Sequence, residues 1–429
     1  MRERLKALAR NKFLRNVFTL LSATSIAQAI SLAIYPVLTR IYTPEEHGLF
    51  ALYMSIIAIT AIISTGKYEM AVMIPKKEKD GEGLTVLGIV LSLVFSILLL
   101  LFIAIFHQSI PIWLGNENIG KWLYFIPAST FLVALFQTLS YWSNRITAYK
   151  TIAGANLSQS ISNSAVKLST SSTLDTGGGL IVGAIVGQAV GALYFLVRLL
   201  RTDLTQFLQL KWGELKNLAK EYKYFPKYRM VHNLINNLSS SLPVFVFTQY
   251  FTHDIVGYYG LGFMLINRPM NLLSNSFSKV FSQRIIEKHN EGKLIHVEVR
   301  KFVLRMAAIA AIPFAIILIF GPGLVSFIFG EEWHEAGVYM RIFVPWLFMA
   351  FLSGPISFLG DMLSVQKKAL VIELIKISFR ILALVIGVLL NNVYLALLLF
   401  SGLSVFVLTY SLFWYLQLAK KADTGRGAV

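Results

Sequence analysis

Five cationic side chains fall inside long apolar stretches of this sequence. They are Lys67, Lys167, Arg268, Lys376 and Arg380. A lysine or arginine at the centre of a membrane helix costs about 2.5–3.5 kcal/mol on insertion scales, so a buried cation needs a reason. Ammonium and guanidinium groups attract phosphates and carboxylates. The chemistry that this set predicts is the binding of an anionic cargo inside a membrane.

Arg268, Lys376 and Arg380 lie deepest in their apolar stretches. Arg268 is next to Pro269, where a kink can loosen the backbone, so it lines a cavity or joins a structural ion pair. Glu373, Lys376 and Arg380 share one helical face through spacings of three and four residues. Glu373 can neutralise Lys376, which leaves Arg380 as the freer charge, with functional and structural roles both open.

Lys67 and Lys167 lie closer to the ends of their stretches. A lysine there can reach the lipid headgroups, so snorkelling is an alternative to substrate binding for both residues. Glu69 follows Lys67 by two residues, a spacing that points the two side chains in different directions on a helix. We therefore expect no local ion pair for Lys67.

Polar side chains recur at helical spacing in four apolar stretches. They are Thr24, Gln28, Ser31 and Tyr35; Asn156, Gln159, Asn163, Lys167 and Thr170; Asn233, Asn236, Asn237 and Ser240; and Arg268, Asn271, Asn275 and Ser278. Lipid cannot satisfy such stripes. Polar contacts between helices would explain any one of them, whereas four together favour a shared hydrated cavity. Asn163 and Asn271 therefore join the five cations as predicted substrate-binding residues.

The composition predicts an all-α integral membrane protein. Of its 429 residues 56% are hydrophobic and only 14% charged, with a mean hydropathy of +0.64, which excludes an ordinary soluble protein. Stretches long enough to cross a bilayer lie at residues 16–38, 49–74, 84–107, 121–142, 147–172, 178–200, 229–251, 255–280, 301–321, 341–364, 368–390 and 393–418. The sixth carries glycines at four-residue spacing, which predict a close-packing face without chemistry of its own: Gly179, Gly183, Gly187 and Gly191. The sequence has no cysteine, no metal-ligand spacing of histidines and no Walker motif, so we expect no cofactor and no enzyme active site.

The distribution of Lys and Arg predicts the orientation of these twelve spans. With the N-terminus inside, 31 of the 39 Lys and Arg residues are cytoplasmic, three are external and five lie within spans. Both termini are then cytoplasmic, and the net charge of +17 reflects this bias rather than nucleic-acid binding. The cytoplasmic connection at 211–228 has apolar residues on one helical face and lysines on the other. We expect it to lie on the anionic inner leaflet.

An internal repeat divides the chain into halves. Residues 40–52 and 250–261 are related by an offset of 209 residues, which aligns Thr43 with Thr252 and Gly48 with Gly257. Each stretch joins two apolar segments at an equivalent place, as in a duplicated unit. We predict an N-terminal lobe of six helices (1–210), an amphipathic linker (211–228) and a C-terminal lobe of six helices (229–429), with the two pseudo-symmetric lobes around a central cavity.

Three stretches of the sequence form a recognisable set: Arg40-Ile-Tyr-Thr-Pro-Glu-Glu-His-Gly-Leu-Phe, Lys67-Tyr-Glu-x-Ala-x-x-x-Pro75 and Gly257-Tyr-Tyr-Gly-Leu261. Through them the sequence resembles polysaccharide flippases of the O-antigen transporter kind, in the multidrug/oligosaccharidyl-lipid/polysaccharide exporter superfamily. The resemblance implies a V-shaped pair of six-helix bundles in the cell inner membrane. It also implies alternating access. The implied cargo is an undecaprenyl-diphosphate-linked oligosaccharide that is used to build lipopolysaccharide. By family position, Lys67 and Arg268 would bind the diphosphate or acidic sugars, and polysaccharide polymerase or assembly proteins would be partners.

Three other functions remain as alternatives. A drug exporter of the same superfamily would need mainly acidic residues in its cavity, and a lipid II flippase would commonly have fourteen spans. A membrane glycosyltransferase or polymerase would need catalytic carboxylates and usually a large external loop. The cations, the span count and the short external loops favour the polysaccharide flippase.

Overall fold

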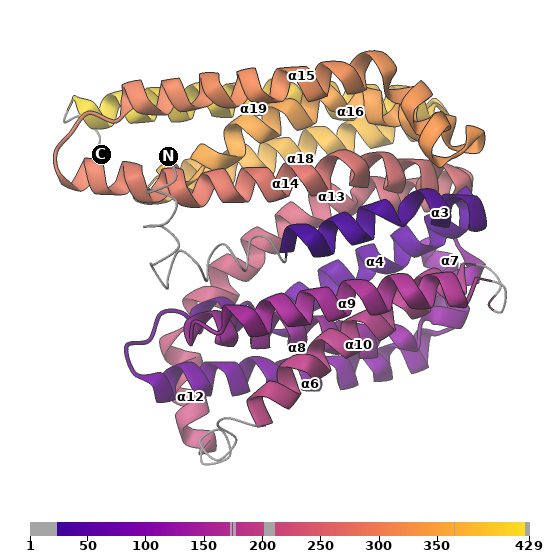
Figure 1. Ribbon diagram of the computed structural model, residues 1–429, viewed down its shortest axis with the longest axis horizontal. Coiled ribbons are helices and arrows are strands. Elements are labelled where there is room, and N and C mark those ends of the chain that lie inside the picture. The colour runs from indigo at the N-terminus through magenta and orange to yellow at the C-terminus, as the bar shows by residue number, and fades with distance from the viewer. Residues whose placement is uncertain (1–23, 172–173, 175–176, 201–210, 364, 425–429) are drawn as a thin grey trace, which may run out of the picture. The chain divides into compact units, whose positions relative to one another are not determined.

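The computed structural model describes residues 24–171, 174, 177–200, 211–363 and 365–424. Every regular element in these ranges is a helix (Figure 1). The chain divides into two compact units, Met1–Ser241 and Leu242–Val429, which we call unit 1 and unit 2. The division falls inside one helix, later in the chain than the linker expected at 211–228.

Unit 1 contains long helices joined by short turns. Residues 24–33 are helical, and the elements that follow are α3 (Tyr35–Ile41), α4 (Pro44–Ser64), α5 (Tyr68–Ala71), α6 (Glu78–Phe106), α7 (Ser109–Leu114), η1 (Glu117–Trp122), α8 (Phe125–Arg145), α9 (Tyr149–Ser169), α10 (Gly178–Leu200), α12 (Trp212–Glu221) and η2 (Phe225–Met230). α13 (Val231–Tyr250) passes from unit 1 into unit 2. α8 packs against α6, α9 and α10, so it lies at the centre of this bundle.

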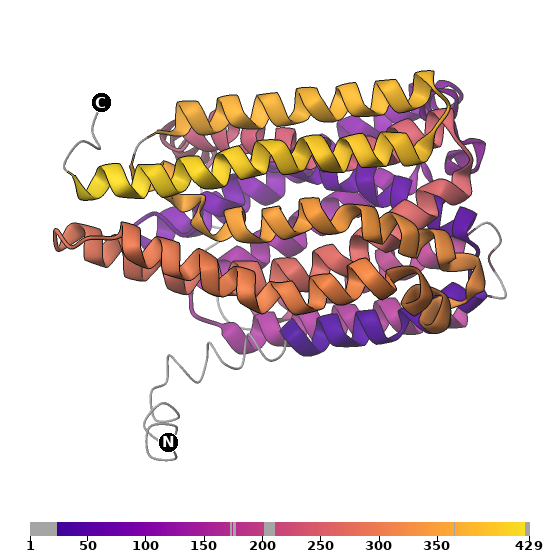
Figure 2. The same cartoon turned by 90° about the horizontal axis from the view of Figure 1, so that it is seen from above.

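Unit 2 is built from longer helices. They are α14 (His253–Asn290), α15 (His296–Phe329), η3 (Glu331–Trp333), α16 (His334–Ser353), η4 (Gly354–Ile356), α17 (Phe358–Met362), α18 (Gln366–Leu389) and α19 (Val393–Asp423). α18 and α19 run side by side, as Figure 2 shows, and α16 packs against α14, α15 and α19. The Asp423 carboxylate at the end of α19 accepts hydrogen bonds from the N–H groups of Ile295 and His296, at 2.7 and 2.9 Å. It thereby caps the start of α15.

The predicted spans correspond to helices, but these helices differ in how apolar they are. Seven described helices are long and apolar enough to cross a membrane by length and composition alone. They match the second, third, fourth, sixth, ninth, tenth and twelfth predicted spans. The first span is described only from residue 24. The fifth, seventh, eighth and eleventh carry the polar stripes or the Glu373–Arg380 charges, which lower their mean hydropathy. The helices that depart from a lipid-like composition are therefore those predicted to face water or cargo.

The internal repeat coincides with two helix starts. Thr43 is the N-cap of α4 and Thr252 is the N-cap of α14, so the residues that the repeat aligns occupy the same place in their helices. Thr43 completes a capping box, because its hydroxyl accepts from the Glu46 N–H at 3.3 Å and Glu46 accepts from the Thr43 N–H at 2.8 Å. Thr252 makes no side-chain cap. The two starts share their position, but only the first has a reciprocal cap.

α9 and α10 pack through the predicted glycine face. A Cβ at Gly183 would meet the side chain of Lys167, and one at Gly187 would meet Asn163 at 2.7 Å. Small residues at four-residue spacing let two helix backbones approach closely within a membrane. The prediction of a close-packing face on α10 is confirmed, and its partner is the helix that carries Asn163 and Lys167.

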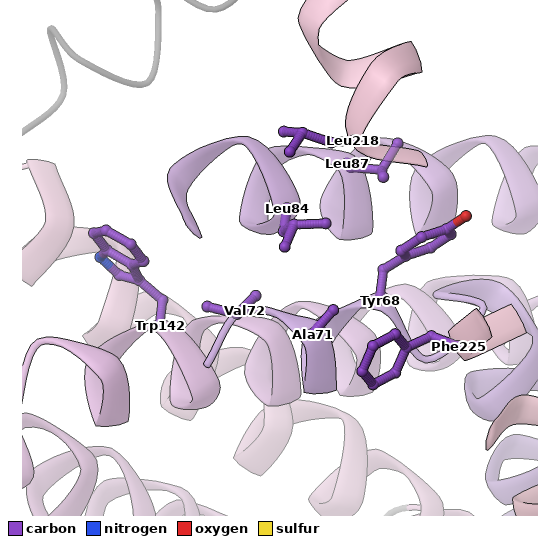
Figure 3. Close-up of a cluster of buried hydrophobic side chains, with 8 residues drawn as sticks. All are labelled: Tyr68, Ala71, Val72, Leu84, Leu87, Trp142, Leu218 and Phe225. Carbon is purple, nitrogen blue, oxygen red and sulfur yellow. The ribbon is translucent and has the colours of Figure 1, made fainter. Parts of the chain in front are cut away.

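α12 has a different environment from the one expected at the membrane surface. Its apolar residues Leu215 and Leu218 are 5% and 7% exposed, and Leu218 joins a buried cluster with Tyr68 and Leu84 (Figure 3). The Tyr68 hydroxyl donates to the carbonyl of Ala219 at 2.9 Å. The expectation that the leucine face lies on lipid is wrong, because α5 and α6 of unit 1 cover it.

Candidate anion-binding site

The helix of the second predicted span breaks immediately before Lys67. α4 ends at Ser64, and Gly66 and Lys67 have φ angles of 57° and 61°. Lysine rarely adopts this left-handed conformation, which costs of order 1–3 kcal/mol where it is imposed. The backbone therefore changes direction at Lys67, and α5 starts as a separate short helix.

The break gives Lys67 an ion-pair partner. Its Nζ lies 3.0 Å from Oε1 of Glu69, and the two side chains are 13% and 0% exposed. The expectation that Glu69 points away is wrong because it assumed a continuous helix, whereas the left-handed turn brings residues two apart together. Lys67 therefore forms a half of a buried ion pair.

Arg145, which sequence reasoning missed, fixes the segment that follows α5. Its guanidinium donates to the carbonyls of Val72 and Pro75, both at 2.7 Å, and to that of Lys77 at 2.9 Å. The planar fork of an arginine suits several acceptors at once. Arg145 comes from the end of α8 and so ties the segment after α5 to the centre of the bundle.

Lys167 is buried rather than exposed to the headgroups. It is 5% exposed, and its Nζ lies 4.4 Å from the ring centroid of Phe50 and 6.0 Å from that of Tyr35. Aromatic faces stabilise a cation at such distances. The Tyr42 hydroxyl donates to the Lys167 carbonyl at 2.7 Å. Snorkelling is thereby excluded for Lys167.

Lys67 and Lys167 lie toward opposite ends of α4. Lys167 contacts Phe50 near the start of that helix, whereas Lys67 follows its last residue, Ser64. The stretch from Phe50 to Ser64 is about 20 Å long at the α-helical rise. The structure thus places these two predicted site residues at separate levels of unit 1, and Asn163 lies with Lys167 on α9.

Arg380 lies between two aromatic rings inside unit 2. It is 3% exposed, and its guanidinium carbon is 4.6 Å from the ring centroids of both Trp346 and Phe400. Its Nε donates to the Ser404 hydroxyl at 3.0 Å. The expectation of a freer charge is wrong, since α16 and α19 enclose the guanidinium.

Lys376 forms the ion pair predicted with Glu373. Its Nζ lies 2.5 Å from Oε2 of Glu373, with the side chains 9% and 28% exposed. The spacing of three residues on α18 produces this contact. Lys376 and Arg380 therefore lie together on the buried side of α18, both held by protein groups.

Arg268 and Asn271 are exposed on α14, which runs through Pro269 without interruption. Asn271 donates to the side-chain carbonyl of Asn267 at 3.0 Å. Within unit 2, Arg268 is thus the accessible cation of the predicted set. Among the described residues no three His, Asp or Glu side chains gather as metal ligands.

Comparisons with known proteins identify a family and a fold. A family model described as polysaccharide biosynthesis protein matches residues 37–338. No protein of curated function matches the sequence.

Three solved structures show the fold. A lipid II flippase, MurJ, in an inward closed conformation aligns with a TM-score of 0.70 at 12% identity, over 94% of this chain and 90% of its own. An inward-facing multidrug resistance MATE family transporter of the MOP superfamily gives 0.66 at 13% identity, over 95% and 99%. A MOP superfamily transporter from Pyrococcus furiosus, described as having a binding pocket of reverse polarity, gives 0.62 at 13% identity, over 97% and 98%.

Proposed function

The chain belongs to the family of polysaccharide biosynthesis proteins, and from that premise we propose that it is a flippase for undecaprenyl-diphosphate-linked oligosaccharide. It moves the cargo from the inner to the outer leaflet of the cell inner membrane by alternating access. The fold that it shares with MATE transporters and with MurJ supports a transporter of the MOP superfamily. Both chain termini would lie in the cytoplasm.

The observation that carries this proposal is the sign of the charges within the spans. Five cations lie there, and the carboxylates that pair with them are Glu69 and Glu373. A surplus of positive charge suits a diphosphate and opposes the cationic drugs that a multidrug exporter would carry. We assign Lys67 and Arg268 to the diphosphate, because Arg268 is exposed and Lys67 lies in a left-handed backbone turn that interrupts its helix.

The remaining predicted residues take supporting roles in this proposal. Asn163 and Asn271 bind sugar hydroxyls, while Lys167, Lys376 and Arg380 raise the positive potential around the cargo from inside the bundles. Export of a diphosphate along a negative-inside potential gains about 2.3 kcal/mol per charge per 100 mV, or roughly 4–5 kcal/mol in all. This gain is sufficient to bias transport outward without ATP. Delivery to an external polysaccharide polymerase would follow.

The test is leaflet transfer of a labelled undecaprenyl-diphosphate oligosaccharide in proteoliposomes. We expect Arg268→Ala to reduce the rate at least tenfold, with exposed Lys121→Ala as the matched control that leaves it unchanged.

Lys67→Ala would leave Glu69 as a buried unpaired charge, so the double variant Lys67→Gln/Glu69→Gln is the cleaner test of Lys67. Wild-type rates that do not respond to collapsed membrane potential and ion gradients would contradict the energetic part of the proposal.

Lipid II is the second candidate cargo. The similarity to MurJ favours it, because that protein is a lipid II flippase with a TM-score of 0.70 to this chain. Lipid II carries the same polyprenyl diphosphate, so the cation argument applies to it equally. Transfer of labelled lipid II in the same vesicles, with no transfer of other lipid-linked sugars, would replace the oligosaccharide as cargo.

A further inference from the structure

We propose that Glu69 is an internal competitor for the diphosphate at Lys67, so that Lys67 captures cargo only when Glu69 releases it. The proposal rests on the flippase function above and adds a residue that controls it. Its starting point is the short contact between Lys67 Nζ and Glu69 Oε1, at 3.0 Å. A second anion can bind Lys67 fully only by weakening this contact.

The environment of Glu69 makes the loss of its cation, Lys67, unfavourable. The side chain is fully buried, and no hydrogen-bond donor among the described residues reaches its Oε2. Removing the cation from a buried carboxylate is strongly unfavourable unless the carboxylate becomes neutral. A diphosphate that draws Lys67 away therefore leaves the Glu69 carboxylate uncompensated, and this cost opposes diphosphate binding. When the cargo moves on, Lys67 returns to Glu69.

Among the charged and titratable groups around the pair, Lys67 is the charge partner of Glu69. α8 contributes Tyr141, which lies within electrostatic reach of Glu69, and Arg145, whose guanidinium is held by backbone carbonyls. On α6, which packs against α5, the acidic side chain Glu82 is buried. η2 packs against α5 and contributes Lys227, which is exposed, and Arg229.

The backbone turn gives the pair a means of opening. Gly66 and Lys67 are both left-handed, so the pair forms within a strained three-residue segment rather than on a regular helix. Tyr68 anchors the next residue to α12, and Arg145 anchors the carbonyls that follow. Movement is thus confined to the Lys67 side chain and its turn, at the end of α4 that we place in the cytoplasm. The site acts at cargo entry.

The experiment measures binding of farnesyl diphosphate to the full chain in nanodiscs by calorimetry, with farnesol as the ligand without phosphate. We expect Glu69→Gln to bind farnesyl diphosphate about tenfold more tightly than wild type near pH 7.5. Glu117→Gln, an exposed carboxylate in η1, is the matched control and should behave as wild type.

A ratio of the two dissociation constants near one overturns the competition while leaving the flippase function intact. Failure of the wild type to bind farnesyl diphosphate better than farnesol contradicts both the competition and the proposed diphosphate site.

Discussion

At the scale of single residues, four of the five predicted site cations are held in one of two ways. Lys67 and Lys376 have carboxylate partners, whereas Lys167 and Arg380 lie against aromatic rings. The i, i+3 rule predicted the Lys376–Glu373 pair because α18 is regular there. It failed for Lys67 because a left-handed turn interrupts the helix. Gly66, directly before Lys67, was the available signal for that turn, since glycine adopts positive φ readily.

The aromatic and carboxylate surroundings predict different changes in stability when a charge is removed. Replacing Arg380 by methionine removes the cation but keeps apolar volume between Trp346 and Phe400, so stability should change by less than about 1.5 kcal/mol. Glu373→Ala leaves Lys376 buried without its carboxylate and should cost about 3 kcal/mol. Thermal unfolding in detergent measures both variants. A larger loss for Arg380→Met than for Glu373→Ala would show that the guanidinium itself holds the unit 2 bundle together.

At the scale of elements, the glycine spacing predicted a packing face but not its partner. The four-residue period of Gly183, Gly187 and Gly191 is visible in the sequence, whereas the choice of α9 depends on tertiary packing. α12 shows the same limit. Its amphipathic pattern was recognised correctly, but a pattern does not say whether lipid or protein covers the apolar face. Leu215 and Leu218 are covered by protein.

The glycine face gives a prediction with an internal control. Gly187→Ala should overpack the α9–α10 contact, because the added Cβ would lie 2.7 Å from the Asn163 Cβ, at a cost of about 1–3 kcal/mol. At Gly402 in α19 an added Cβ meets nothing within 4 Å, so Gly402→Ala should be neutral or slightly stabilising. Unfolding temperatures in one detergent compare the two. Equal effects would contradict the assignment of this face to close packing.

At the scale of the whole molecule, the fold class follows from the sequence because hydropathy and helical length are local properties. The spans that fail a strict apolar test, such as α9 and α14, are those with polar stripes, so their polarity and their expected place beside the cargo have one cause. The compact units divide at Ser241, inside α13, and not at a loop. Composition could not locate that point, because it depends on which turns of α13 pack with which bundle.

The absence of cysteine permits a direct test of orientation. Single cysteines that replace Lys121 and Lys216, both exposed, should lie on opposite sides of the membrane, and a membrane-impermeant maleimide distinguishes the two sides. The positive-inside distribution predicts external labelling at residue 121 and labelling at residue 216 only after the membrane is opened. The reverse pattern would invert the topology and place Lys67 at the exit side.

The matched N-caps of α4 and α14 carry an evolutionary consequence. Thr43 and Thr252 begin corresponding helices in two halves that each have six predicted spans. An even number returns the chain to its starting side, so a second copy enters the membrane in the same direction as the first. An ancestral gene encoding one half could then double and fuse in frame without inverting the charge bias of either copy. Under this origin, the capping box that is present at Thr43 and absent at Thr252 is a difference that arose between the two copies.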